Sequence, residues 1–161
     1  MRTLSTAIGF ALWLVLASLP APSAAADRHA GYYYPPPAST EVYKSRARTL
    51  DGVDRKTRIA FVINVVEQMN AKPYPPGLSF FAKGDEAEKL ILVSNFEGRL
   101  NTVYRARALL AALTSVARTT PIFVQNKVED ILTFLDLVKM LGFTQITVSD
   151  GDSFAYQVKI Q

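Results

Sequence analysis

The chain has 161 residues, of which 49% are hydrophobic and 20% are charged, so its composition is that of one globular domain and excludes a disordered chain. Its 18 Lys and Arg residues only slightly exceed its 14 Asp and Glu residues, a mild excess that does not favour nucleic acid as a partner. There is no Cys, and the single His, His29, lies close to the N-terminus predicted below for the mature chain. The folded part therefore lacks the residues for Ser-His-Asp or Cys-His catalysis and for a zinc site built on imidazole or thiolate; we expect no metal and no cofactor.

Residues 1–26 have the pattern of a secretory signal peptide. Arg2 provides a positive start, residues 7–19 (AIGFALWLVLASL) form an uninterrupted apolar run, and two prolines precede the small residues 23–26. The apolar run has 13 residues, whereas a membrane-spanning helix needs about 20. We therefore predict cleavage after Ala25 or Ala26, a location in the periplasm or outside the cell, and no membrane anchor after cleavage; the alternative is an uncleaved anchor.

Residues 27–42 are expected to form an extended linker, because three Tyr and three consecutive Pro favour polyproline II. A spacer is the simpler interpretation, and a docking segment for a partner with an aromatic groove is the alternative. The single folded domain would then span residues 43–161. Its first part, residues 43–58 (YKSRARTLDGVDRKTR), carries six basic residues against two acids, which favours a solvated loop and helix start or a patch for anionic partners.

The next segments predict a helix or strand and then a hairpin. Apolar residues from Ile59 to Met69 recur at spacings of three and four, as in a helix with Asp54 or Thr57 as its cap, but their β-branching leaves a strand open. Residues 78–82 (LSFFA) and 90–94 (LILVS) predict two short strands joined as a β-hairpin across KGDEAEK.

Two helices are expected after the hairpin. The first runs through TVYRARALLAALTSVART, with one apolar face that includes Leu110 and Leu113. The second is expected to begin at Asn126, with Glu129 completing a capping box, and to end at Gly142 in the left-handed conformation. This second helix would bury Val128, Ile131, Leu132, Leu135 and Val138.

The chain closes with residues 145–148 and 154–160, which predict a second hairpin across SDGDS, because Asp and Gly tolerate the positive φ of a tight turn. Asp150 and Asp152 also suggest a calcium loop, but its fifth, sixth and twelfth places hold Phe154, Ala155 and Gln161, which cannot serve there. A carboxylate pair for catalysis remains the alternative to a turn.

These elements predict an α+β fold, with a small antiparallel sheet of two β-hairpins and two or three helices packed on one face. The other face of the sheet would be wet or open to a partner. The candidate ligand or partner contacts are the charged side chains of the two hairpin turns and the first helix after the hairpin: Lys83, Asp85, Glu86, Glu88, Arg105, Arg107, Asp150 and Asp152. A solvated hairpin tip and turn is the competing interpretation of the hairpin charges.

Four strings, FAKGDEAEKLIL, YRARALLA, VEDILTFLDL and LGFTQITVSDGDSFAYQV, resemble in this order a group of small exported bacterial proteins of uncharacterised function. The similarity covers roughly residue 43 to the C-terminus. Some members carry the label "molybdopterin-guanine dinucleotide biosynthesis protein A", which implies a guanylyltransferase with a Gly-rich phosphate loop, L-x-G-G-x-S-x-R-M-G. This chain has no such loop, so the resemblance implies no site residue here.

Export and the missing catalytic residues lead to the expectation of a non-enzymatic binding or assembly factor. Its partner would be an envelope protein or a small ligand, and not nucleic acid. The alternative is a small enzyme that uses Lys, Arg and carboxylate groups; convergence of Lys83, Glu88, Arg105 and Asp150 in one pocket would favour it.

Overall fold

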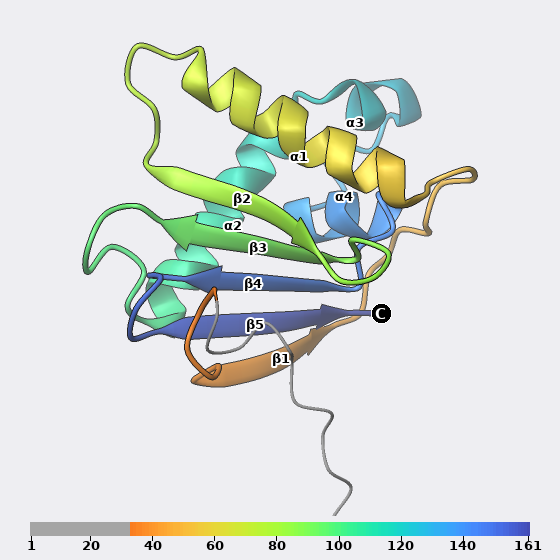
Figure 1. Cartoon of the computed structure of the whole chain (residues 1–161). Helices are drawn as coiled ribbons and strands as arrows, with labels where there is room; N and C mark the ends of the chain where they lie inside the picture. Colours follow the sequence, from red (N-terminus) through yellow and green to blue (C-terminus); the bar gives the residue numbers. More distant parts are fainter. Residues whose placement is uncertain (1–32) are drawn as a thin grey trace, which may run out of the picture.

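The computed structural model describes residues 33–161. The predicted signal peptide, and residues 27–32 of the predicted linker, lie outside the described residues. The described part is a mixed five-stranded sheet with four helices, an α+β fold (Figure 1). In chain order the elements are β1 (Ser39–Tyr43), α1 (Arg55–Asn70), β2 (Leu78–Lys83), β3 (Lys89–Ser94), α2 (Val103–Ala117), α3 (Pro121–Asn126), α4 (Phe134–Met140), β4 (Gln145–Ser149) and β5 (Ala155–Ile160).

Both predicted hairpins form, but the sheet is not purely antiparallel. The strand order is β1-β5-β4-β3-β2, with antiparallel pairs β2–β3 and β4–β5. The hairpins join through β3 and β4, which are parallel, with Leu90 opposite Ile146. This pairing is possible because three helices separate β3 from β4 in the chain, and parallel neighbours require a long crossover.

The predicted linker boundary at residue 42 is wrong. Residues 39–43 form β1, which pairs in parallel with β5 from Ser39 opposite Tyr156 to Tyr43 opposite Ile160. The run of prolines, which have no amide proton, ends at Pro37. From Ala38 on the backbone can join the sheet, and Ala38 N donates to Ala155 O at 2.8 Å. The folded domain therefore begins before residue 43.

Of the helix and the strand left open for residues 59–69, the structure has the helix, since α1 spans Arg55–Asn70. Its N-cap is Asp54, whose carboxylate accepts the Thr57 N–H at 2.8 Å. Thr57 completes a capping box, so both predicted cap residues take part. The helix predicted after the hairpin is also confirmed, as α2, with Thr102 as its N-cap.

The single helix predicted from Asn126 is wrong. The chain forms two short helices there, because Lys127 adopts φ +53° and ends α3. Asn126 donates its side-chain N–H to Ile122 O instead of capping a helix. The capping box that starts α4 is formed by Thr133 and Asp136. Of the residues expected to be buried, Ile131 is 57% exposed, because it lies in the loop between the two helices.

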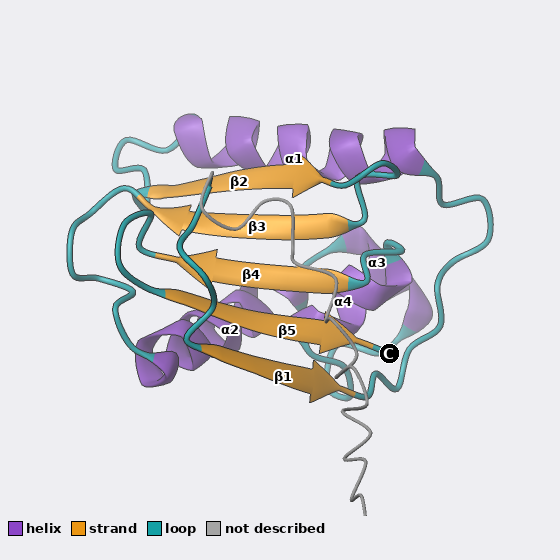
Figure 2. Cartoon of the chain, turned by 60° about the horizontal axis from the view of Figure 1, so that its bottom comes forward, coloured by secondary structure: helices purple, strands orange, loops and turns teal. Residues whose placement is uncertain are grey.

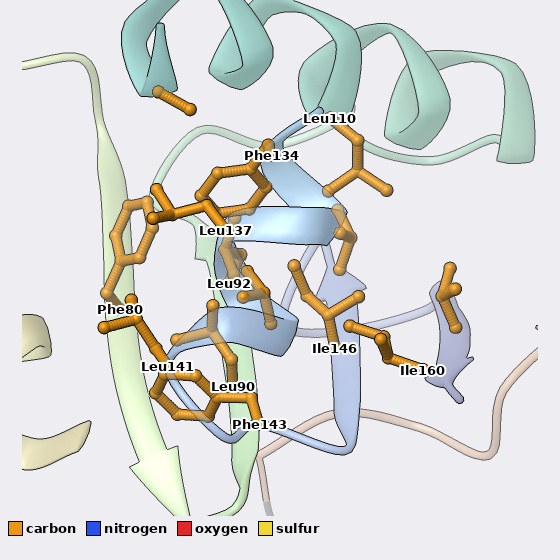
Figure 3. Close-up of a cluster of buried hydrophobic side chains, with 14 of the residues drawn as sticks. Phe80, Leu90, Leu92, Leu110, Phe134, Leu137, Leu141, Phe143, Ile146 and Ile160 are labelled. Atoms are coloured by element: carbon orange, nitrogen blue, oxygen red, sulfur yellow. The ribbon is translucent and has the colours of Figure 1, made fainter. Parts of the chain in front are cut away.

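One hydrophobic core holds the helices to one face of the sheet (Figure 3). Alternate residues of the inner strands enter it, such as Leu90 and Leu92 on β3, and both are fully buried. The view in Figure 2 shows α2, α3 and α4 behind the sheet and α1 alongside β2. Gly142 follows α4 with φ +75°, as predicted, and a Cβ there would lie 2.7 Å from the guanidinium of Arg58.

The opposite face of the sheet is not wet along its middle, contrary to expectation. Ile91 is fully buried there and forms a small cluster with Tyr34 and Ala155. Tyr33 stands against Phe81, with ring centroids 5.8 Å apart. The start of the described chain therefore packs on this face, and it belongs to the domain rather than to a free spacer.

Candidate functional site

The structure separates the candidate residues into a group at each end of the sheet, with Arg107 apart from both, beside Glu41 of β1. Lys83, Asp85, Glu86 and Glu88 lie at the tip between β2 and β3, where β3 begins. Arg105 and the Asp150 loop lie at the other end of the sheet, where the parallel strands β3 and β4 end. The four residues whose convergence would favour an enzyme therefore do not meet in one pocket.

The tip between β2 and β3 is organised by its own side chains. The carboxylate of Glu88 accepts the Glu86 N–H at 3.0 Å. It also packs against Gly84, where a Cβ would come within 2.2 Å of both carboxylate oxygens. Arg58 of α1 is buried beneath the tip and donates to Glu86 O at 2.8 Å. Glu88 and Arg58 thus stabilise the loop conformation.

Arg107 joins α2 to the sheet. Its guanidinium forms an ion pair with Glu41 of β1, and the Tyr156 hydroxyl donates to the same carboxylate at 2.8 Å. The hydrogen bond from Tyr156 lowers the pKa of Glu41, and the Arg107 cation lowers it further. Burial raises the pKa of Tyr156. The carboxylate therefore stays charged and holds β1, β5 and α2 together.

Asp150 organises the turn between β4 and β5. Its Oδ1 accepts the backbone N–H groups of Asp152, Ser153 and Phe154 at 2.8–3.0 Å. Burial alone would raise the pKa of Asp150, but these hydrogen bonds outweigh it and lower the pKa. Gly151 has φ +85°, as a turn requires. Asp150 is thus occupied by the turn itself, and the Asp152 side chain is exposed.

A groove of about 590 Å³ lies between the start of β2, the loop of residues 95–102 and the first turns of α2. This loop, on the left of Figure 1, follows the carboxyl end of β3, where open sheets with parallel strands commonly bind ligands. The volume falls within the ordinary range for small-molecule sites. The groove is lined by Pro76, Leu78, Glu97, Gly98, Arg99, Leu100, Arg105, Ala108 and Leu109.

Two arginines with fixed orientations line this groove. Arg105 donates to Gly98 O and, at 2.8 Å, to Asn101 Oδ1. Arg99 donates to Pro76 O at 3.3 Å, and its guanidinium lies 5.0 Å from the centre of the Phe96 ring. Neither arginine has an ion-pair partner within residues 33–161. Both guanidinium groups therefore keep donors for an anionic ligand.

The rest of the groove lining is mostly apolar. Its apolar lining comes from Leu78, Leu100 and Leu109, and its one carboxylate is that of Glu97. Across residues 33–161 no group of three His, Cys, Asp or Glu side chains is placed to hold a metal. Within the same residues, no helix has the length and apolarity needed to cross a membrane.

The sequence pattern pointed to Arg105 but not to Glu97, Arg99 or Leu100. The available signal was the length of the loop, because eight residues between a strand and a helix exceed the usual two to six. The groove itself depends on Pro76 and Leu78, which precede the loop by about 20 residues, so spacing along the chain did not reveal it.

Comparison of the chain with protein-family models, curated proteins and solved structures finds no match.

Proposed function

We propose that the chain is an exported, non-enzymatic binding protein, and that its groove holds a ligand with an apolar body and a carboxylate or phosphate group. The observation that carries the proposal is the pairing of an apolar lining with two arginines that lack ion-pair partners among the described residues. An apolar groove with a few placed polar groups is the common form of a small-molecule site.

The anionic group is inferred from the positions of the two arginines. Arg105 is the third residue of α2, whose first turn contains no acidic side chain. The positive end of the helix dipole therefore adds to the guanidinium charge. Glu97 is the one opposing charge in the lining, so the groove is cationic by one unit.

The apolar body of the ligand is inferred from the leucines and from nearby exposed aromatics. Phe96 is 51% exposed on the same loop, and Tyr104 is 81% exposed on the first turn of α2. Exposed aromatic side chains beside a groove are enriched where proteins bind partners. Binding would bury this apolar surface and orient the anion toward the arginines.

Octanoate, octyl phosphate and neutral 1-octanol are suitable probes, followed by amide chemical-shift changes across the chain. We expect the two anions to shift residues 97–109 in a saturable manner, with octanol much weaker. Arg105→Gln should weaken anion binding about tenfold, as expected for the loss of one charged hydrogen-bonding group. Arg118→Gln, an exposed residue at the other end of α2, is the matched control.

The proposal fails if octanol binds as well as octanoate, or if Arg105→Gln and Arg118→Gln have the same effect. It also fails if the anions shift residues elsewhere and leave the groove unchanged.

A further inference from the structure

The excess positive charge of the described domain is concentrated in one segment. Residues 44–56, here called the basic strap, contain five Lys and Arg residues against two Asp, a formal charge of +3. The rest of residues 33–161 contains eleven basic and eleven acidic residues and is neutral. The strap thus accounts for the whole net charge, an asymmetry that indicates an anionic partner at this place.

The strap is held to the domain although residues 44–54 contain no helix or strand. Ser45 N donates to Gln161 O at 2.8 Å, and Leu50 N donates to Met140 O at 3.0 Å. The Asp136 carboxylate accepts the Ser45 hydroxyl at 2.7 Å and the Arg46 N–H at 3.0 Å. The basic side chains therefore project from a fixed backbone, which reduces the entropy lost on binding.

The arrangement of side chains turns the cations outward. Lys44, Arg46 and Arg48 are exposed, whereas Ser45 and Ala47 between them are partly buried. Arg55 and Lys56 are exposed where α1 begins. None of these five cations has an ion-pair partner within residues 33–161. In Figure 1 the strap runs from the end of β1, beside the C-terminus, to the start of α1.

The partner that fits this surface best is an anionic membrane surface. The strap contains no aromatic residue, whereas proteins that hold single-stranded nucleic acid use aromatic side chains to stack the bases. Residues 44–54 of the strap form a loop and only its last two residues begin a helix, whereas duplex DNA is read by a helix or a β-ribbon that enters the major groove. Leu50, 36% exposed, lies between the cations. An apolar side chain among basic ones is typical of segments that rest on anionic lipid.

We propose that the basic strap docks the domain onto a bilayer that contains anionic phospholipid. The cations contact the lipid phosphates, and Leu50 enters the boundary between headgroups and acyl chains. The groove lies at the other end of the sheet, so it stays open to solvent while the strap is bound. This inference is independent of the ligand proposed for the groove.

The test is co-sedimentation of the purified chain with vesicles of phosphatidylcholine, alone or mixed with phosphatidylglycerol. One variant combines Lys44→Gln, Arg46→Gln and Arg48→Gln. The control combines Lys72→Gln, Arg118→Gln and Lys127→Gln, which removes the same charge from exposed positions outside the strap. Both variants keep the same N-terminus as the wild type, so a contribution from the first residues cancels.

We expect the wild type to bind the mixed vesicles, to bind the neutral vesicles much less, and to be released by salt. The strap variant should lose roughly 100-fold in partitioning, since each basic residue near an anionic surface contributes about fivefold. The control should lose less than about threefold, since its charges lie outside the strap. Leu50→Ser should weaken binding without changing its dependence on salt.

Equal losses in the two triple variants would overturn the proposal, because net charge alone would then explain binding. Equal binding of the wild type to neutral and mixed vesicles would overturn it too. So would tighter strap-dependent binding to an oligonucleotide than to the mixed vesicles. Circular dichroism melting of each variant checks that it is folded; the altered side chains are exposed, so we expect all of them to melt like the wild type.

Discussion

Asp136 offers the sharpest test of how this fold is held together. Its side chain is fully buried. Its two carboxylate oxygens accept hydrogen bonds from the N-terminal part of the domain and from the residue that precedes α4. Oδ1 accepts from Ser45 and Arg46, and Oδ2 accepts from Tyr43 and Thr133. One side chain therefore ties the end of β1 and the strap to the start of α4.

The change Asp136→Asn preserves the shape and removes the charge. The amide oxygen can still accept from Ser45 and Arg46, but the NH₂ group replaces Oδ2, which accepts the Thr133 N–H at 2.8 Å and the Thr133 hydroxyl at 2.9 Å. The hydroxyl can rotate to accept, whereas the backbone N–H cannot. A buried donor without an acceptor costs about 1–3 kcal/mol, and the weaker remaining hydrogen bonds add to it. We expect unfolding to become easier by about 3 kcal/mol.

Urea unfolding and thermal melting measure this loss, and a domain of this size should melt about 10 °C lower. The control is Asp152→Asn, the same change at an exposed carboxylate, which should alter the melting temperature by no more than about 2 °C. Ser45→Ala removes a single donor and should lie between the two.

The effect of Asp136 should also depend on pH. Burial alone would raise the pKa of Asp136, but hydrogen bonds from Thr133, Ser45 and Arg46 outweigh it, so its pKa lies below the ordinary value. Its stabilisation is therefore present above the pKa of the unfolded chain, about 3.9, and is lost as the pH falls through the lower folded value. The difference between wild type and Asp136→Asn should be constant from neutral pH to about 5 and should shrink below about 4. A difference no larger than that of Asp152→Asn, or one unchanged at low pH, would refute the reasoning.

Four further predictions concern the turn, the N-terminus and the absence of a phosphate loop. Gly151→Val should lower the unfolding free energy by roughly 1–3 kcal/mol, because φ is +85° and a Cβ would lie 3.1 Å from Val93; a neutral result in thermal melting would contradict the turn. Asp152→Ala should leave the melting temperature unchanged with and without calcium, and a calcium-dependent difference between it and the wild type would indicate a ligand role. N-terminal sequencing of the exported protein should find a start near Ala26, whereas an intact Met1 in the membrane fraction would support an anchor. Calorimetry with Mg-GTP should show no binding, and micromolar affinity would require a nucleotide site that the sequence does not indicate.

The sequence alone predicted the elements whose signals are local. Asp54 or Thr57 was the predicted cap of α1, and both take part in its capping box, whose residues are only three apart. The two short runs at residues 78–82 and 90–94 predicted the β2–β3 hairpin, and the Asp-Gly step predicted the turn after β4. In each case the interactions that form the element lie within one short segment of the chain, so the sequence of that segment is enough to predict it.

Tertiary structure decided the rest. Residues 39–43 form a strand because β5 offers an edge more than 100 residues away, and the Tyr-Pro composition before them gave no sign of it. Thr133 and Asp136 replaced Asn126 and Glu129 as the capping pair. Asp136 accepts hydrogen bonds from Thr133 at the start of α4 and from Tyr43, more than 90 residues earlier in the chain. Long-range hydrogen bonds to a buried charge outweigh a local capping pattern, because leaving that charge unpaired costs several kcal/mol. The groove likewise exists only where the start of β2 meets α2, so its arginines acquired a shared environment through folding and not through their spacing in the sequence.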